Sequence, residues 1–167
     1  MDSINFFNAE KYFSDMCAKN KLAREHGFHF CTCSGIENLE GPLQVFSTQS
    51  AFFCLDDTND GGYGTGRSGG WHKKRVFTVF FLHRYEYNNE DERLSVLQIC
   101  RDLSRQAMSK MIKDTEDLKN ELVYLDVNNV MTRELGKYFL NGCTGCYFMI
   151  EMGEPVNLVY NPDEWLK

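Results

Sequence analysis

The sequence predicts an α+β protein in which two main helices pack on a mostly antiparallel sheet, one long helix lying across that sheet. Residues 90–118 carry apolar side chains at helical spacing, and residues 28–33 alternate between apolar and polar as strands do. Residues 75–87 are apolar on both faces at first, which indicates a central strand. No linker interrupts the chain, so we expect a single domain over residues 1–167.

The N-terminal part is expected to run from a helix into a strand. Residues 3–24 have apolar side chains at helical spacing, with Ser3 as a cap and Gly27 beyond the end. In "FHFCTC" (28–33), the two phenylalanines should share one face, and His29 should share the other face with both cysteines.

A short helix and two strands should follow. "SGIENLEGP" (34–42) begins with a capping-box pattern, and Gly41-Pro42 is expected to end the helix. The apolar runs at 43–46 and 51–55 are typical of strands.

The stretch "DDTNDGGYGTGRSGGWHKKR" (56–75) should connect a hairpin in which residues 51–57 pair with 75–87. Its glycines predict a long flexible loop over residues 58–72. The stretch has neither glycine pattern of a nucleotide-binding loop, and a strand rather than a helix follows it. Its three aspartates lack the closing glutamate of a calcium loop.

The second half begins with the long helix at 90–118, which Asn89 should cap. Strands are expected at 121–126, 146–152 and 156–160. Asn161 and Pro162 should then start a last helical turn, from which Trp165 folds back.

Composition limits the classes of function. A net charge of −6 disfavours general nucleic-acid binding, so a DNA contact stays possible but is not expected to be direct. The chain has no apolar run long enough for a membrane span and no signal-peptide pattern, which predicts a cytoplasmic protein without membrane contact. Aromatic residues reach 14%, and such an excess suits a large core, a partner surface, or both.

The glycine-rich segment is the main candidate for a functional contact. A loop this rich in glycine loses much conformational entropy when it orders, and docking on a neighbouring subunit would provide the compensating contacts. The sequence therefore predicts a docking arm rather than an active site, with no catalytic residue, no metal and no cofactor. The residues expected to contact the partner are Tyr63, Arg67, Trp71, Lys73, Lys74 and Arg75.

Two alternatives from other classes stay open. Cys31, Cys33, Cys143 and Cys146 could form a zinc site, although only the last two have the usual spacing of a knuckle. The seven cysteines are otherwise expected to be reduced and buried. The second alternative is a small enzyme in which the glycine-rich segment acts as a lid.

Several stretches together resemble small structural proteins from prophage-type gene clusters of Bacteroidetes. They are "DDTNDG", "KKRVFTVFFLHRY", the helix at 90–118, and "NGCTGCYFMIEMGEPVNLVYNPDEW" near the C-terminus. The order of elements is similar to that of phage tail-terminator and neck proteins. The resemblance implies a non-enzymatic virion-assembly protein that forms a homo-oligomeric ring, of C₆ type, or an adaptor. It also implies other tail or neck proteins as partners, a location in the host cytoplasm or the virion, and a loop at 61–75 that grips a neighbour.

Overall fold

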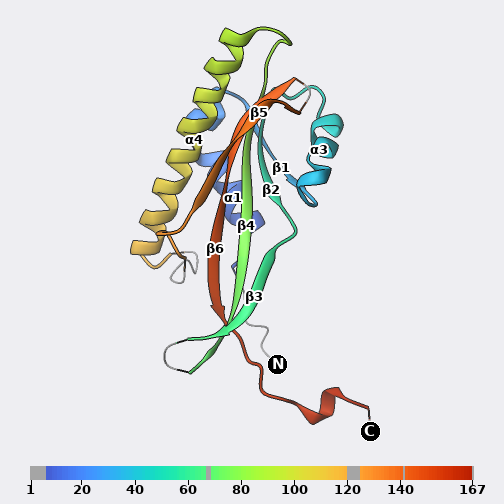
Figure 1. The fold of residues 1–167 in the computed structure, drawn as a ribbon. Coiled ribbons are helices and arrows are strands. Elements are labelled where there is room, and N and C mark those ends of the chain that lie inside the picture. Colours follow the sequence, from blue (N-terminus) through green and yellow to red (C-terminus); the bar gives the residue numbers. More distant parts are fainter. Residues whose placement is uncertain (1–6, 67–68, 120–124, 141, 167) are drawn as a thin grey trace.

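A computed structural model describes residues 7–66, 69–119, 125–140 and 142–166. In it a twisted sheet carries the long helix and an N-terminal helix on one face and a short helix on the other (Figure 1). The helices are α1 (Ala9–Lys19), α2 (Lys21–Glu25), η1 (Ile36–Asn38), α3 (Glu40–Val45), α4 (Glu90–Glu116) and η3 (Pro162–Glu164). The strands are β1 (Phe28–Cys33), β2 (Ala51–Asp56), β3 (Asp60–Thr65), β4 (Trp71–Arg84), β5 (Met131–Leu140) and β6 (Cys143–Pro155).

The predicted fold class is confirmed: this is an α+β protein whose sheet is mostly antiparallel. The strand order is β1-β2-β4-β6-β5, with β3 paired to β4 outside this path. Among the strands of the described residues, only β1 and β2 are parallel. The predicted pairing of residues 51–57 with the following long strand is present as Ala51–Leu55 against Val79–His83. The central strands β4 and β6 pair along their length, from His72 opposite Pro155 to Arg84 opposite Cys143.

Alternation along the strands builds two cores, one on each face of the sheet. The larger core lies under α1 and α4 and contains Phe13, Phe53, Phe81 and Phe148. The smaller core lies under α3 and contains Cys31, Cys33, Phe52 and Phe80 among others. The predicted split of residues 28–33 is confirmed, because the phenylalanines of β1 face the larger core and its cysteines face the smaller one.

The long helix begins as predicted. Asn89 accepts a hydrogen bond from the backbone N–H of Glu92 at 3.1 Å, and three acidic residues in the first turn suit the positive end of the helix dipole. Buried side chains at helical spacing, from Val96 to Met111, then place α4 against β4 and β6.

The predicted helix at 3–24 is two helices. Asn8 caps α1, and Ser3 lies outside the described residues. Asn20 ends α1, and its side chain accepts a hydrogen bond from Ala23 N–H to start α2. The same side chain donates to Gln106 of α4 at 2.9 Å, so the break between the helices is tied to the long helix.

The strand predicted at 43–46 is wrong, because most of these residues belong to α3. Pro42 does not end a helix here but lies in the first turn of α3, where a missing backbone N–H costs nothing. Arg84 donates hydrogen bonds to the carbonyls of Leu43 and Gln49, which holds α3 and the chain after it beside the sheet.

The second half differs from the prediction at residues 131–140 and 156–160, and one predicted strand lies mostly outside the described residues. The strand expected at 121–126 lies mostly outside the described residues, although Leu125 forms an isolated bridge with Met152. β5 was not predicted, because Met131 to Glu134 are exposed on this edge strand and show no apolar alternation. Residues 156–160 are not a strand, since no neighbouring strand pairs with them in the described structure.

None of the helices built from the described residues combines the length and apolar character needed to cross a membrane.

Candidate functional site

The glycine-rich segment forms a β-hairpin that projects beyond the helices (Figure 1). We use "the hairpin" for β3, residues 66–70 and the first six residues of β4. Asp60 to Thr65 pair in antiparallel register with Val76 to Trp71, so much of the predicted loop at 58–72 is strand. Glycine weakens a strand, so β3 would not be expected from its own residues. It forms because β4, which is held by β6 on its other edge, has free backbone groups with which β3 pairs.

Asp56 marks the junction between β2 and the hairpin. Its buried carboxylate accepts hydrogen bonds from the backbone N–H groups of Gly35 and Thr58 and from the Thr58 hydroxyl. Asp56 is therefore a structural turn residue. Among the described residues, no group of three or more His, Cys, Asp or Glu side chains is arranged to hold a metal ion.

One face of the hairpin carries exposed aromatic side chains. Tyr63 is 60% exposed and Trp71 is 47% exposed, on adjacent strands. Lys73 lies directly opposite Tyr63, with its Nζ 5.9 Å from the centre of the tyrosine ring. Three of the residues predicted to contact a partner therefore share one surface.

The opposite face of the hairpin is rich in glycine, and the side chains on it, such as His72 and Lys74, come mainly from β4. Gly62 lies opposite Lys74, which in turn lies opposite Gly153 of β6, and Gly64 lies opposite His72. A Cβ atom added at any of these three glycines would meet nothing within 4 Å, and none of the three has a positive φ. Neither backbone conformation nor internal packing thus requires glycine at these positions.

Gly61 provides the contrast within the same strand. A Cβ atom there would lie 2.0 Å from the carbonyl oxygen of Lys74, so the pairing of β3 with β4 itself requires glycine. Because glycine in a strand costs roughly 0.5–1 kcal/mol relative to alanine, the unconstrained glycines need another explanation, and close approach of a partner is one.

Arg75 does not belong to the exposed surface, which corrects the sequence-based prediction. Its guanidinium donates to both carboxylate oxygens of Glu154, at 2.8 and 2.6 Å, and to the carbonyl of Phe7 at 3.0 Å. Glu154 is buried and also accepts a hydrogen bond from the Phe7 backbone N–H. This paired charge fastens the N-terminal segment to the base of the hairpin.

The other predicted contact residues differ in their surroundings. Lys74 is exposed and forms an ion pair with Glu151 at 2.7 Å, which raises the pKa of Lys74. Arg67 lies outside the described residues. The structure thus brings Tyr63, Trp71, Lys73 and Lys74 to the two faces of the hairpin and places Arg75 inside the fold.

The four cysteines of the zinc alternative do not come together. Cys31, Cys33 and Cys143 face the smaller core, whereas Cys146 faces the larger core across the sheet. Cys31 and Cys33 instead lie beside Cys54 of β2, and hydrogen bonding to Cys31 raises the pKa of the Cys54 thiol. Burial raises the pKa of Cys146 to about 12. These thiols are buried structural groups, and the zinc site is wrong.

Most of the segment that would act as the lid of a small enzyme is held in the sheet. β3 and β4 hold residues 60–65 and 71–76 in the sheet, which leaves only residues 66–70 between them. An open depression of about 400 Å³ lies elsewhere, at the start of α4, and residues 86–91 line it.

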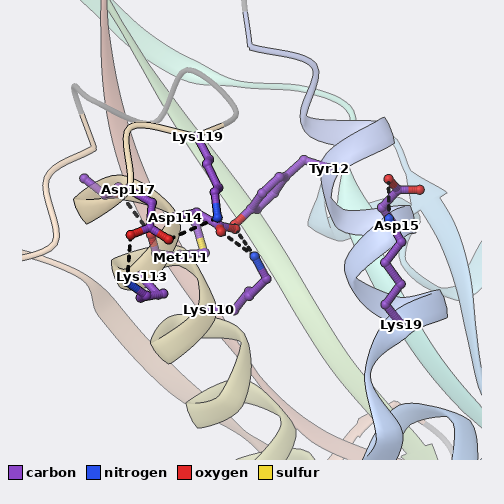
Figure 2. Close-up of polar contacts among 10 residues, drawn as sticks. Tyr12, Asp15, Lys19, Lys110, Met111, Lys113, Asp114, Asp117 and Lys119 are labelled. Atoms are coloured by element: carbon purple, nitrogen blue, oxygen red, sulfur yellow. Dashed lines mark hydrogen bonds and ion pairs between the residues drawn. The ribbon is translucent and has the colours of Figure 1, made fainter.

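A buried polar network joins α1 to the end of α4 (Figure 2). The Tyr12 hydroxyl donates to the Asp114 carboxylate at 2.8 Å, and Lys110 forms an ion pair with the same carboxylate. Burial, the hydrogen bond and the negative charge of Asp114 raise the pKa of Tyr12 well above its ordinary value. The phenol therefore stays protonated and cannot act as a base, which identifies the network as a link between helices.

Sequence reasoning missed one exposed apolar region. Residues 156–166 follow β6 and expose several large apolar side chains, and the apolar run at 156–160 had instead indicated a strand. Pro155, the last residue of β6, is a signal in the sequence that the strand ends there, because proline lacks the backbone N–H that a strand ladder uses.

Comparison with models of known protein families and with curated proteins finds no match.

Proposed function

We propose that the protein is a non-enzymatic assembly protein that forms a homo-oligomer through its hairpin, as a ring or adaptor of the phage tail or neck type. The order of elements that resembles tail-terminator and neck proteins supports the phage setting. The proposal includes other tail or neck proteins as partners.

The glycine-rich face of the hairpin carries the proposal. Gly62, Gly64 and Gly153 leave a strip of backbone open to solvent, although nothing inside the protein occupies the space that their side chains would take. Glycine in a strand marks places where another backbone or a ligand approaches closely. A neighbouring copy packed on this strip gives the three glycines a common role.

The outer edge of β3 supports the same conclusion. In the described structure β3 pairs only with β4, so its other row of backbone N–H and C=O groups is open to a strand from outside. Exposed edges are templates for pairing with another chain, and natural proteins keep them short or charged when no partner is intended. β3 has a single charged residue, Asp60, at its first position.

The test adds side chains to the glycine-rich face without disturbing the fold. The double variant Gly62→Val/Gly64→Val adds β-branched side chains where the space is open, so its unfolding free energy should equal or exceed that of the wild type. We expect the wild type to show a mass that rises with concentration toward a closed oligomer in light scattering, and the variant to remain monomeric.

Thr65→Val is the matched control, because Thr65 lies in the same strand on the aromatic face opposite the glycine strip. The control should assemble like the wild type. A double variant that assembles normally, or a wild type that is monomeric at every concentration, would contradict the proposal.

A further inference from the structure

Residues 156–166, which we call the extended arm, leave the sheet beside the hairpin and run away from the rest of the protein (Figure 1). The Val156 backbone N–H donates to the carbonyl of Trp71 at 3.0 Å, which fixes the start of the arm to the hairpin. Beyond Val156, the hydrogen bonds that the arm forms with described residues join residues of the arm to one another. The arm is therefore anchored at one end only.

The arm exposes an unusual amount of apolar surface. Val159 is 79% exposed and Trp165 is 65% exposed, and Leu158, Tyr160 and Leu166 are also exposed. The rings of Tyr160 and Trp165 stack with their centres 6.2 Å apart. Contiguous apolar surface of this kind marks sites of interaction with another protein.

Local hydrogen bonds give the arm a shape before it binds. Asn161 accepts a hydrogen bond from Asp163 N–H and donates one to the Glu164 carboxylate, which forms the turn η3 between the two aromatic residues. A segment that is ordered before binding loses less entropy on binding than a disordered one.

The charges of the arm and the hairpin are complementary. Residues 156–166 contain two acidic residues, Asp163 and Glu164, and no basic residue. The hairpin presents Lys73 on the same face as the exposed rings of Tyr63 and Trp71, whereas Lys74 projects from the opposite face and pairs with Glu151. Aromatic side chains flanked by opposite charges are typical of the two sides of a specific interface.

We propose that the extended arm binds the hairpin of a second copy of this chain. Its stacked rings pack against Tyr63 and Trp71 of that copy, and its two carboxylates face Lys73. Each copy carries an arm and a hairpin at the same end of the molecule. Every arm in the assembly can therefore bind a hairpin, and every hairpin can bind an arm. This inference rests on the proposed self-association and assigns it a second contact.

Reversing the charges on each side separately tests this contact. One variant carries Asp163→Lys and Glu164→Lys in the arm, and the other carries Lys73→Glu in the hairpin. Like charges then face each other in either variant alone, and we expect self-association to weaken at least about tenfold in both.

Mixing the two variants gives the decisive result. The basic arm of the first variant meets the acidic hairpin of the second, while the other arm–hairpin pair between them is the native one. Assembly should return to near the wild-type level in the equimolar mixture, as measured by light scattering. An arm that binds the hairpin of its own copy predicts no such rescue, so a mixture that stays monomeric overturns the inference.

Unchanged thermal unfolding of both charge variants confirms that they fold. If the arm variant assembles like the wild type while Gly62→Val/Gly64→Val does not, the arm contact is wrong and the proposed function stands. If the wild type never associates, both are wrong.

Discussion

The two ends of β4 lie in opposite environments, although they belong to one continuous strand. From Phe77 to Leu82 its apolar side chains are buried between the helices on one face and α3 on the other, and Phe80 and Phe81 are fully buried. From Trp71 to Lys74 the same strand runs beyond both helix layers, paired with the glycine-rich β3. We call residues 77–82 of β4 the buried end, because other parts of the chain cover both of their faces, and residues 71–74 the open end, because no described helix covers them.

The comparison separates what the sequence uses for folding from what it leaves for contact. In the buried end every position is filled, and Gly145 of β6 is required because a Cβ atom there would lie 2.0 Å from the Phe81 carbonyl oxygen. In the open end Gly62 and Gly64 are not required by anything inside the protein. Strand pairing thus requires glycine at Gly145 in the buried end and at Gly61 in the open end, whereas Gly62 and Gly64 form part of an exposed surface.

The largest expected effect comes from truncating one aromatic residue at each end. Phe81→Ala removes a ring that packs against Phe53 and Phe148, and should lower the unfolding free energy by about 3–5 kcal/mol. Tyr63→Ala, at the open end, should leave stability nearly unchanged. Denaturant unfolding of both variants measures the difference, and equal losses would show that the hairpin is part of the cooperative core.

Adjacent residues of β4 provide a sharper test at the boundary between the two ends. Arg75→Ala leaves the buried Glu154 carboxylate without its partner and should cost about 3 kcal/mol of unfolding free energy. Lys74→Ala removes only an exposed ion pair on the other face and should have no measurable effect on stability. Chemical unfolding measures the free energy of unfolding of both variants. An Arg75→Ala protein as stable as the wild type would mean that the cooperative core begins only after Arg75, at Val76 or Phe77.

The buried end was largely predictable from the sequence, because local patterns and burial agree there. The apolar stripe of α4, its Asn89 cap and the alternation in β1 all reflect contacts with one core or the other. One exception is α3, because the apolar residues at 43–46 fit a strand or a helix equally well. Another is β5, whose exposed residues show no apolar alternation.

The open end was less predictable, since its structure depends on distant residues. β3 forms because β4 is a template for it, which no local pattern of glycines reveals. Arg75 looks like part of a basic surface in "WHKKR", and only its neighbours Glu154 and Phe7, far away in sequence, draw it inside. The arm at 156–166 has the apolar content of a strand but no strand to pair with.

The smallest expected effect tests whether the buried end also holds its helices together through polar contacts. Tyr12→Phe removes the hydrogen bond to Asp114 and should cost about 1 kcal/mol at neutral pH, because Lys110 still pairs with that carboxylate. The folded protein raises the pKa of Tyr12, so above pH 10 the unfolded phenol ionises while the folded one stays protonated. The unfolded state then binds fewer protons than the folded state, and stability must fall as pH rises.

The loss of stability that comes from ionisation of the unfolded Tyr12 phenol is absent in Tyr12→Phe. Lysines and the other tyrosines titrate in both proteins, so their effects cancel in the comparison. The difference in unfolding free energy between wild type and variant should therefore be constant below pH 9 and shrink, then change sign, as pH rises above 10. Urea unfolding at pH 7, 9, 10 and 11 measures it. A difference that stays constant across this range would mean that Tyr12 reaches solvent and that α1 is not locked to α4, so that the helix-covered end is looser than its packing indicates.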